Sequence, residues 1–256
     1  MNKKIISILL VVLLIAVGFA GCGGGEEGGD DVKTYVIASD TTFAPFEFQN
    51  DAGEYVGIDI ELLAAIAEDQ GFKYELQNIG FDAAVASLEA GQADGVIAGM
   101  SITPQREEKY DFSAPYYDSG VVMAIAATDE TIKTYDDLKG KKVAVKTATE
   151  GATFAESIKD QYGFELVYFS ESPIMYEDVK AGNTVACFED YPVMGYNISL
   201  GNGLKMVTDM EKGSSYGFAT MKGAQPELVE MFTKGLENLK ANGKYQEIID
   251  KYIVKE

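Results

Sequence analysis

Arg106 is the only arginine among the 256 residues of the chain, and every other basic residue is lysine. A guanidinium differs from an ammonium chiefly in its planar fork of donors, which grips a carboxylate or phosphate with two parallel hydrogen bonds. Thr103 and Pro104 have the pattern of an N-cap followed by proline at the first helical position, which predicts Arg106 in a first helical turn. The helix dipole favours anions there, so helix stability does not explain this cation. Either Arg106 holds a ligand carboxylate, or it is an exposed arginine paired with an acid such as Glu107.

Three more charged residues stand where predicted strands end. Asp40 follows a strand at 34–39, Lys146 ends a strand at 142–146, and Asp190 follows a strand at 184–188. Each has a plainer explanation: Asp40 could cap a turn, Asp190 could cap the next helix, and Lys146 could be a solvated strand end.

Taken together, these residues suit a zwitterion. Arg106 can hold a carboxylate with help from the Ser101 hydroxyl and backbone N–H groups at the helix start, and Asp190 can hold an ammonium. Phe43 and Phe81 can sandwich an aliphatic side chain, although both could instead be core residues. The remaining candidates at the same strand ends are Ala98, Gly99, Thr149 and Glu150.

Strands and helices alternate along the chain, which predicts an α/β fold with parallel sheets covered by helices. The first unit has predicted strands at 34–39, 74–77 and 95–98 and helices at 58–68 and 82–90. The second repeats the alternation with strands at 121–127, 142–146, 164–169 and 184–188, helices at 134–138 and 153–161, and a helix opening at Ser172. A strand at 216–220 and helices at 226–241 and from 244 follow. Two lobes are expected, with a ligand at the carboxyl ends of the strands.

Composition excludes several functions. The net charge of −20 argues against nucleic acid and anionic lipid headgroups as partners, because both require a basic face. The chain has no histidine, which removes the commonest metal ligand and the usual general base. Any enzyme built on this chain would need carboxylate, lysine or tyrosine chemistry. We expect no metal, no cofactor and no catalytic residue.

The N-terminal segment has the layout of an export signal. Lys3 and Lys4 precede an apolar run at 5–17, and small residues lead to Cys22. This resembles a lipoprotein signal, which implies that residues 1–21 are removed, that Cys22 carries the lipid, and that the Gly-rich acidic residues 22–32 form a tether. An uncleaved anchor and an ordinary cleaved signal are the alternatives. Cys187 then has no partner for an intrachain disulfide and is expected to be buried.

Four stretches of the chain resemble the polar amino acid binding proteins of ABC importers, known as solute-binding protein family 3. They are 38–48 (ASDTTFAPFEF), 55–62 (YVGIDIEL), 98–106 (AGMSITPQR) and 111–117 (DFSAPYY). The resemblance implies a two-lobed, hinged fold of the periplasmic-binding-protein type II: residues 33–117 and 215–256 form lobe 1, and 118–214 form lobe 2. It also implies a monomer, anchored outside the cell membrane, that encloses one free L-amino acid and docks on a membrane permease.

The resemblance further implies that Arg106 binds the α-carboxylate and that Asp190 and Gly99 bind the α-ammonium. Asp40 and Lys146 would then read the ligand side chain, because an amide offers N–H to Asp40 and C=O to Lys146. This pair resembles that of glutamine-binding members, so glutamine is expected, with asparagine next. Glu150, if it faces the ligand and not solvent, would favour a cationic ligand such as arginine or lysine.

Two other function classes are compatible with the same fold. One is a dehydratase acting on cyclic prephenate-like acids, which would require a placed general acid. The other is a sensory or adhesive surface lipoprotein that uses the same ligand pocket.

Overall fold

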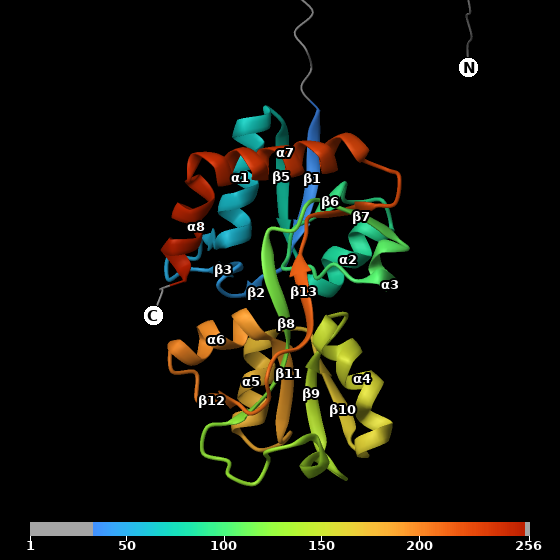
Figure 1. Ribbon diagram of the computed structural model, residues 1–256, viewed down its shortest axis with the longest axis vertical. Helices are drawn as coiled ribbons and strands as arrows, with labels where there is room; N and C mark the ends of the chain where they lie inside the picture. Colours follow the sequence, from blue (N-terminus) through green and yellow to red (C-terminus); the bar gives the residue numbers. More distant parts are fainter. Residues whose placement is uncertain (1–32, 254–256) are drawn as a thin grey trace, which may run out of the picture. The chain divides into compact units, whose positions relative to one another are not determined.

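The structure is a computed structural model, and it describes residues 33–253. The expected signal segment, the tether and Cys22 lie outside these residues. Two sheets, each covered by helices, form two lobes of the described chain (Figure 1).

The sheet of lobe 1 has the strand order β5-β1-β6-β14-β7. Its three parallel strands are β5 (Lys73–Asn78), β1 (Thr34–Ser39) and β6 (Gly95–Val96). Strand β14 (Ala219–Met221) runs antiparallel to β6 and to the edge strand β7 (Tyr110–Phe112). Its helices are α1 (Ile58–Gln70), α2 (Phe81–Glu89), α3 (Pro104–Glu107), α7 (Pro226–Asn242) and α8 (Lys244–Tyr252).

Helix α1 forms because its apolar residues repeat along one face and its C-terminus has a glycine stop. Leu62, Leu63 and Ile66 are fully buried. Gly71 ends the helix with a φ of 72°, a left-handed conformation that favours glycine. A side chain at Gly235 of α7 would come within 2.8 Å of Ile66, so that glycine lets the two helices approach.

The sheet of lobe 2 has the order β10-β9-β11-β8-β12, with β13 also paired to β8. Strands β10 (Glu165–Phe169), β9 (Lys142–Lys146) and β11 (Ala186–Asp190) are parallel, whereas β8 (Tyr117–Ala126), β12 (Leu204–Met206) and β13 (Glu211–Tyr216) add antiparallel pairs. The helices are the 3-10 helix η1 (Tyr135–Leu138), α4 (Glu150–Tyr162), α5 (Ser172–Lys180) and α6 (Tyr191–Ser199).

Strands β8 and β13 run side by side from one lobe to the other (Figure 1). Tyr117 at the start of β8 pairs with Tyr216 at the end of β13. A small sheet of β2 (Thr42–Phe43), β3 (Glu47–Gln49) and β4 (Tyr55–Val56) lies below β1 and continues the first lobe toward the second.

The α/β class is as predicted, but the parallel character is confined to three adjacent strands in each sheet. The predicted strand at 216–220 is divided between two strands, because β13 ends at Tyr216 and pairs with β8, whereas β14 begins at Ala219 and pairs with β6 and β7 in the other sheet. Short strands of two or three residues, such as β2, β4 and β12, carry no periodic signal and were missed.

Candidate ligand-binding site

A small cavity lies where the two lobes meet. It is lined from lobe 1 by Asp40, Phe43, Phe81, Ala98, Gly99, Ser101 and Arg106, and from lobe 2 by Lys146, Thr149, Glu150 and Asp190. All eleven candidate binding residues from the sequence are therefore brought together. The free volume is about 10 Å³, room for about one water molecule, so a larger ligand requires the lobes and side chains to move apart.

Arg106 lies in the first turn of α3, as predicted. The Thr103 hydroxyl oxygen caps the helix by accepting from the Arg106 N–H at 3.2 Å. The guanidinium donates from Nη1 to the Ser101 carbonyl and from Nη2 to the Ala148 carbonyl, both at 2.9 Å. It also lies 5.6 Å from the centre of the Phe81 ring. Within residues 33–253 it makes no salt bridge, so the alternative of a surface pair with Glu107 is wrong.

The loop after β9 reaches across to Arg106. Ala148 has a φ of 64°, in the left-handed region that non-glycine residues rarely adopt, and this conformation presents its carbonyl to the guanidinium. Thr149 fixes the loop, because its hydroxyl donates to the Lys146 carbonyl at 2.7 Å and accepts from the Ala152 N–H at 3.2 Å. Ala148 was not a candidate from the sequence, and no sequence signal marks a strained alanine.

Asp40 and Lys146 form an ion pair between the lobes. Asp40 Oδ2 accepts from Lys146 Nζ, and each residue is only 1% exposed. Lys146 is therefore not a solvated strand end. Asp40 Oδ1 also accepts from the Thr41 N–H at 2.7 Å, which is the local contact expected of a turn cap. Lys146 Nζ lies 5.1 Å from the centre of the Phe43 ring, which adds a cation–π contact.

Asp190 faces Tyr216 and does not cap the helix that follows it. No side-chain cap bond forms at the start of α6, and Asp190 Oδ2 instead accepts from the Tyr216 hydroxyl at 2.6 Å. The Ser119 hydroxyl donates to the Tyr216 hydroxyl in turn at 3.0 Å. Burial, followed by the neighbouring Glu189, raises the pKa of Asp190 to about 7. Sequence reasoning missed Tyr216, because it lies in β13, far along the chain from Asp190.

Phe43 and Phe81 are both 4% exposed, so they are core residues as well as cavity walls. Gly99 fits against Phe43: its φ is 53°, and a Cβ there would lie 2.4 Å from the Phe43 ring. Only glycine provides both this backbone conformation and this close approach.

Glu150 is the first residue of α4, and it is half-buried in the cavity lining and not exposed. Burial raises the pKa of its carboxyl, and the nearby Arg106 acts in the opposite direction. Burial lowers the pKa of the Arg106 guanidinium, while Glu150 and Asp190 oppose that shift. Three carboxyl groups and two cations therefore line the cavity.

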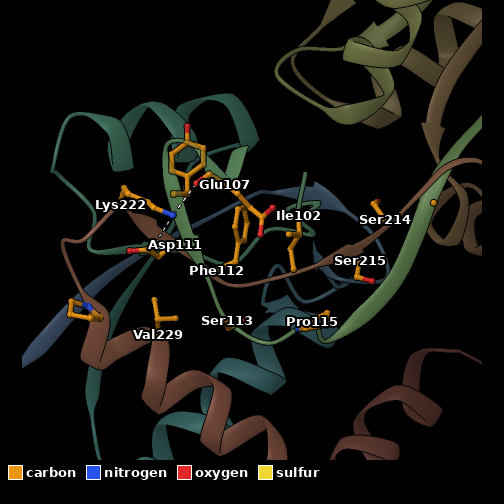
Figure 2. A pocket seen from close by; sticks show the side chains of 13 residues that line it. Ile102, Glu107, Asp111, Phe112, Ser113, Pro115, Ser214, Ser215, Lys222 and Val229 are labelled. Atoms are coloured by element: carbon orange, nitrogen blue, oxygen red, sulfur yellow. Dashed lines mark hydrogen bonds and ion pairs between the residues drawn. The ribbon is translucent and has the colours of Figure 1, made fainter. Parts of the chain in front are cut away.

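A larger hollow of about 850 Å³ lies elsewhere, beside β7 and the start of α7 (Figure 2). Its one ion pair joins Lys222 Nζ and Asp111 Oδ1 at 3.0 Å. Its lining includes Ile102 from the stretch 98–106 and Asp111, Phe112, Ser113 and Pro115 from the stretch 111–117, but none of the eleven candidates takes part. Hence the convergence of charged side chains, not the volume, marks the ligand site.

A cavity lined by charged side chains between the lobes of an α/β protein suits a small polar solute. The chain belongs to the bacterial extracellular solute-binding proteins, family 3, whose family model matches residues 35–255. This confirms the resemblance drawn from the sequence motifs. Within residues 33–253, no cluster of three or more acidic, cysteine or histidine residues suits a metal, and no helix is long and apolar enough to cross a membrane.

Three similar proteins have informative descriptions. The ABC transporter arginine-binding protein 1 of Escherichia coli (strain K12) is 32% identical over 94% of this chain and 98% of its own length. The solved substrate-binding domain 2 of GlnP from Lactococcus lactis, in an open conformation, is 44% identical over 87% of this chain and 96% of its own, with a TM-score of 0.60. An ancestral arginine-binding protein bound to glutamine is 33% identical over 87% of this chain and 98% of its own, with a TM-score of 0.79.

The two TM-scores rank these structures in the opposite order to sequence identity. The open domain has more residues in common with this chain but superposes less well than the glutamine-bound protein. The structure described here therefore superposes better on that ligand-bound protein than on the open domain.

Proposed function

We propose that this protein is an extracytoplasmic receptor that binds a polar L-amino acid, with glutamine preferred, between its two lobes and delivers it to an ABC importer. Residues 118–214 would move as one lobe against 33–117 and 215–256. The similarity to the ABC transporter arginine-binding protein 1 and to the substrate-binding domain of GlnP supports this role.

The observation that carries the proposal is the buried Asp40–Lys146 pair in a cavity that also contains Arg106 and Asp190. Arg106 and Asp190 suit the carboxylate and ammonium common to all α-amino acids. Asp40 and Lys146 remain for the side chain of the ligand.

An amide side chain satisfies both members of this pair. If the lobes open slightly and the amide enters between them, its NH2 donates to Asp40 and its C=O accepts from Lys146, which gives two charge-assisted hydrogen bonds. An anionic side chain would meet the Asp40 carboxylate, and a cationic one would leave Lys146 facing a like charge. Asparagine carries the same amide on a side chain one methylene shorter and is therefore the next candidate.

Glu150 supports a second candidate ligand. A third carboxyl group in the cavity lining attracts a cationic side chain, and the similar proteins include two described as arginine-binding. Arginine or lysine is therefore the alternative ligand, and it requires Lys146 to turn away from Asp40.

The test is isothermal titration of the purified protein, unfolded and refolded to release retained ligand, against the common L-amino acids. Tight binding of glutamine, weaker binding of asparagine and little heat with glutamate are expected. Tight arginine binding without glutamine binding would establish the alternative ligand. Failure to bind any α-amino acid would exclude the proposal, and turnover of arogenate would instead indicate the dehydratase.

We further propose that Cys22 carries a lipid that anchors the receptor, as a monomer, to the outer face of the cell membrane. Replacing Cys22 by Ala should release the protein from the membrane fraction and abolish its labelling by a radioactive fatty acid. Co-purification with a permease from crosslinked cells would distinguish transport from a sensory or adhesive role.

A further inference from the structure

Two carboxyl groups, of Glu47 and Asp59, are fully buried beneath the wall of the ligand cavity. Glu47 belongs to β3 and pairs across the small sheet with Phe43, which lines the cavity. Asp59 lies in the first turn of α1, where its N–H donates to the Phe46 carbonyl at 2.9 Å. Neither residue lines the cavity.

One of the four carboxyl oxygens of Glu47 and Asp59 accepts two hydrogen bonds. Asp59 Oδ2 accepts from the Gly99 N–H and from the Tyr116 hydroxyl, both at 2.8 Å. By contrast, Asp59 Oδ1 and both oxygens of Glu47 receive no hydrogen bond from any N–H or O–H group within residues 33–253. The two carboxyl groups nonetheless lie within hydrogen-bonding reach of each other.

The charges around Glu47 make a second buried anion costly. It is faced by Asp59 from α1, by Asp40 from the end of β1 and by Tyr116 from the start of the crossing strands. Among the described residues, the cation that faces it is Lys146, which is already paired with Asp40. Two carboxylates in contact have no proton between them, whereas a carboxylic acid beside a carboxylate makes a strong hydrogen bond.

We propose that Glu47 is a neutral carboxylic acid that donates its proton to Asp59 Oδ1 and thereby positions Gly99 at the ligand cavity. Burial, followed by repulsion from Asp59 and Asp40, raises the pKa of Glu47 well above its usual range, in agreement with the geometry. Asp59 remains the acceptor for Gly99 and Tyr116.

This arrangement joins the cavity wall to the strands between the lobes. Gly99 lines the cavity, and Tyr116 directly precedes β8, which crosses to lobe 2. Because both donate to the same oxygen of Asp59, any rotation of that carboxylate disturbs both. Glu47 is thus a positioning residue for the site, a role that rests on the proposed ligand-binding function.

The first test is the pH dependence of stability of Glu47→Gln, which keeps the shape and a donor but cannot ionise. A carboxyl group with a raised native pKa stabilises the fold at low pH and loses that contribution as pH rises from its unfolded value toward its native value. The unfolding equilibrium constant of the wild type should therefore rise relative to that of Glu47→Gln, by up to about tenfold per pH unit between about pH 5 and the native pKa. A constant ratio over this range would overturn the proposal.

The matched control is the same comparison in an Asp190→Asn background. Asp190 is also buried, and its pKa is raised to about 7, so it titrates within the same pH range. The ratio between the proteins without and with Glu47→Gln should still rise with pH in this background. Loss of the trend there would show that the effect does not come from a proton on Glu47.

The second test separates the hydrogen-bond donor at position 47 from the volume of its side chain. Glu47→Met is similar in size but leaves Asp59 Oδ1 without a donor, so affinity for L-glutamine should fall about tenfold, whereas Glu47→Gln should stay within about twofold of the wild type. Equal affinities in the two variants would remove the positioning role. If the wild type binds no glutamine, the proposed function fails, but the stability test and the carbon-13 NMR shift of the Glu47 carboxyl still decide whether the proton is there.

Discussion

Arg106 is held by backbone carbonyls from both lobes, Ser101 on one side and Ala148 on the other. These two contacts use two of the five N–H donors of its guanidinium. The carbonyls orient the planar group, and a lysine at this position could not satisfy both of them and still offer a fork to a carboxylate. The value of the arginine therefore lies in its geometry as much as in its charge.

Replacing Arg106 by Lys should lower the affinity for the amino acid by about 1.5 to 3 kcal/mol, the range for charge-assisted hydrogen bonds. The charge is kept, so the loss would reflect the missing fork. Isothermal titration of the variant and the wild type measures this difference. A dissociation constant unchanged by the substitution would show that Arg106 does not bind the carboxylate.

Asp190 should make ligand binding dependent on pH. Its pKa is raised to about 7 by burial and then by Glu189, and an α-ammonium requires the ionised form. Affinity should therefore fall by up to about tenfold per pH unit as the pH drops below about 7, because a proton competes with the ligand. Titrations across this range measure it. Asp190→Asn should bind more weakly and without this pH dependence, and a flat wild-type profile would contradict the assignment.

The raised pKa of Asp190 also affects the stability of the ligand-free protein, which should be greater at low pH, where ligand affinity is lower. A buried carboxyl group whose native pKa is raised from 3.8 to about 7 stabilises the fold most below pH 4 and loses that contribution as the pH rises to 7. Bound amino acid should reverse the trend, since its ammonium stabilises the Asp190 carboxylate.

Glu150 decides between the two candidate ligands. Replacing it by Gln removes a charge from the cavity lining but keeps the size of the side chain. If the ligand is glutamine, affinity for it should change by less than about threefold and weak binding of arginine should decline further, as expected for a partly screened charge. Competition titrations would measure the affinities for glutamine and arginine in the wild type and the variant. A large loss of glutamine affinity would show that Glu150 contacts the ligand directly.

At the scale of elements, loops after strands form the site, and the conformations of these loops are tightly constrained. The loop after β6 brings Gly99 against Phe43, and the loop after β9 holds Ala148 in the left-handed region. Both conformations are costly for ordinary residues, so the packing around each loop must maintain them.

Gly99→Ala tests this constraint, with Gly91→Ala as the matched control. Both glycines have positive φ, but a Cβ at Gly91 meets nothing within 4 Å, whereas at Gly99 it would lie 2.4 Å from Phe43. The control should lose about 1 to 2 kcal/mol of unfolding free energy from its backbone conformation alone. Gly99→Ala should lose more and should also lose amino acid affinity, as measured by urea denaturation and titration. Equal effects in the two variants would show that contact with Phe43 is unimportant.

At the scale of the whole molecule, side chains from both lobes stabilise the arrangement described here. The Asp40–Lys146 pair and the bond from Arg106 to the Ala148 carbonyl both cross between the lobes. A buried ion pair contributes little net stability when intact, but loss of one partner leaves an uncompensated charge.

Lys146→Met should therefore favour the open arrangement, because opening lets water reach the unpaired Asp40 carboxylate. Small-angle X-ray scattering should show a larger radius of gyration, and amino acid affinity should fall by at least about a hundredfold, which corresponds to about 3 kcal/mol, the lower end of the cost of breaking a buried pair. The double variant Asp40→Asn with Lys146→Met should recover the compact scattering profile. Unchanged scattering in the single variant would mean that the pair does not hold the lobes together.

The sequence by itself determined the fold class and predicted the candidate residues of the site. The periodic run of α1 with its stop at Gly71, and the cap of α3 at Thr103, depend on interactions between residues close in the sequence. The strand ends then predicted eleven candidates for one edge of the fold, because carboxyl ends of parallel strands converge. The short strands gave no such signal, since two or three residues have no period.

Only the tertiary structure decided which groups pair. The contact of Tyr216 with Asp190, the approach of Ala148 to Arg106 and the burial of Glu47 against Asp59 all join residues that are distant in sequence. Desolvation depends on every neighbour in space, so the protonation of Glu47 and Asp190 cannot be read from local sequence. The lone arginine indicated where a carboxylate could bind; the packing of two lobes determined which groups surround it.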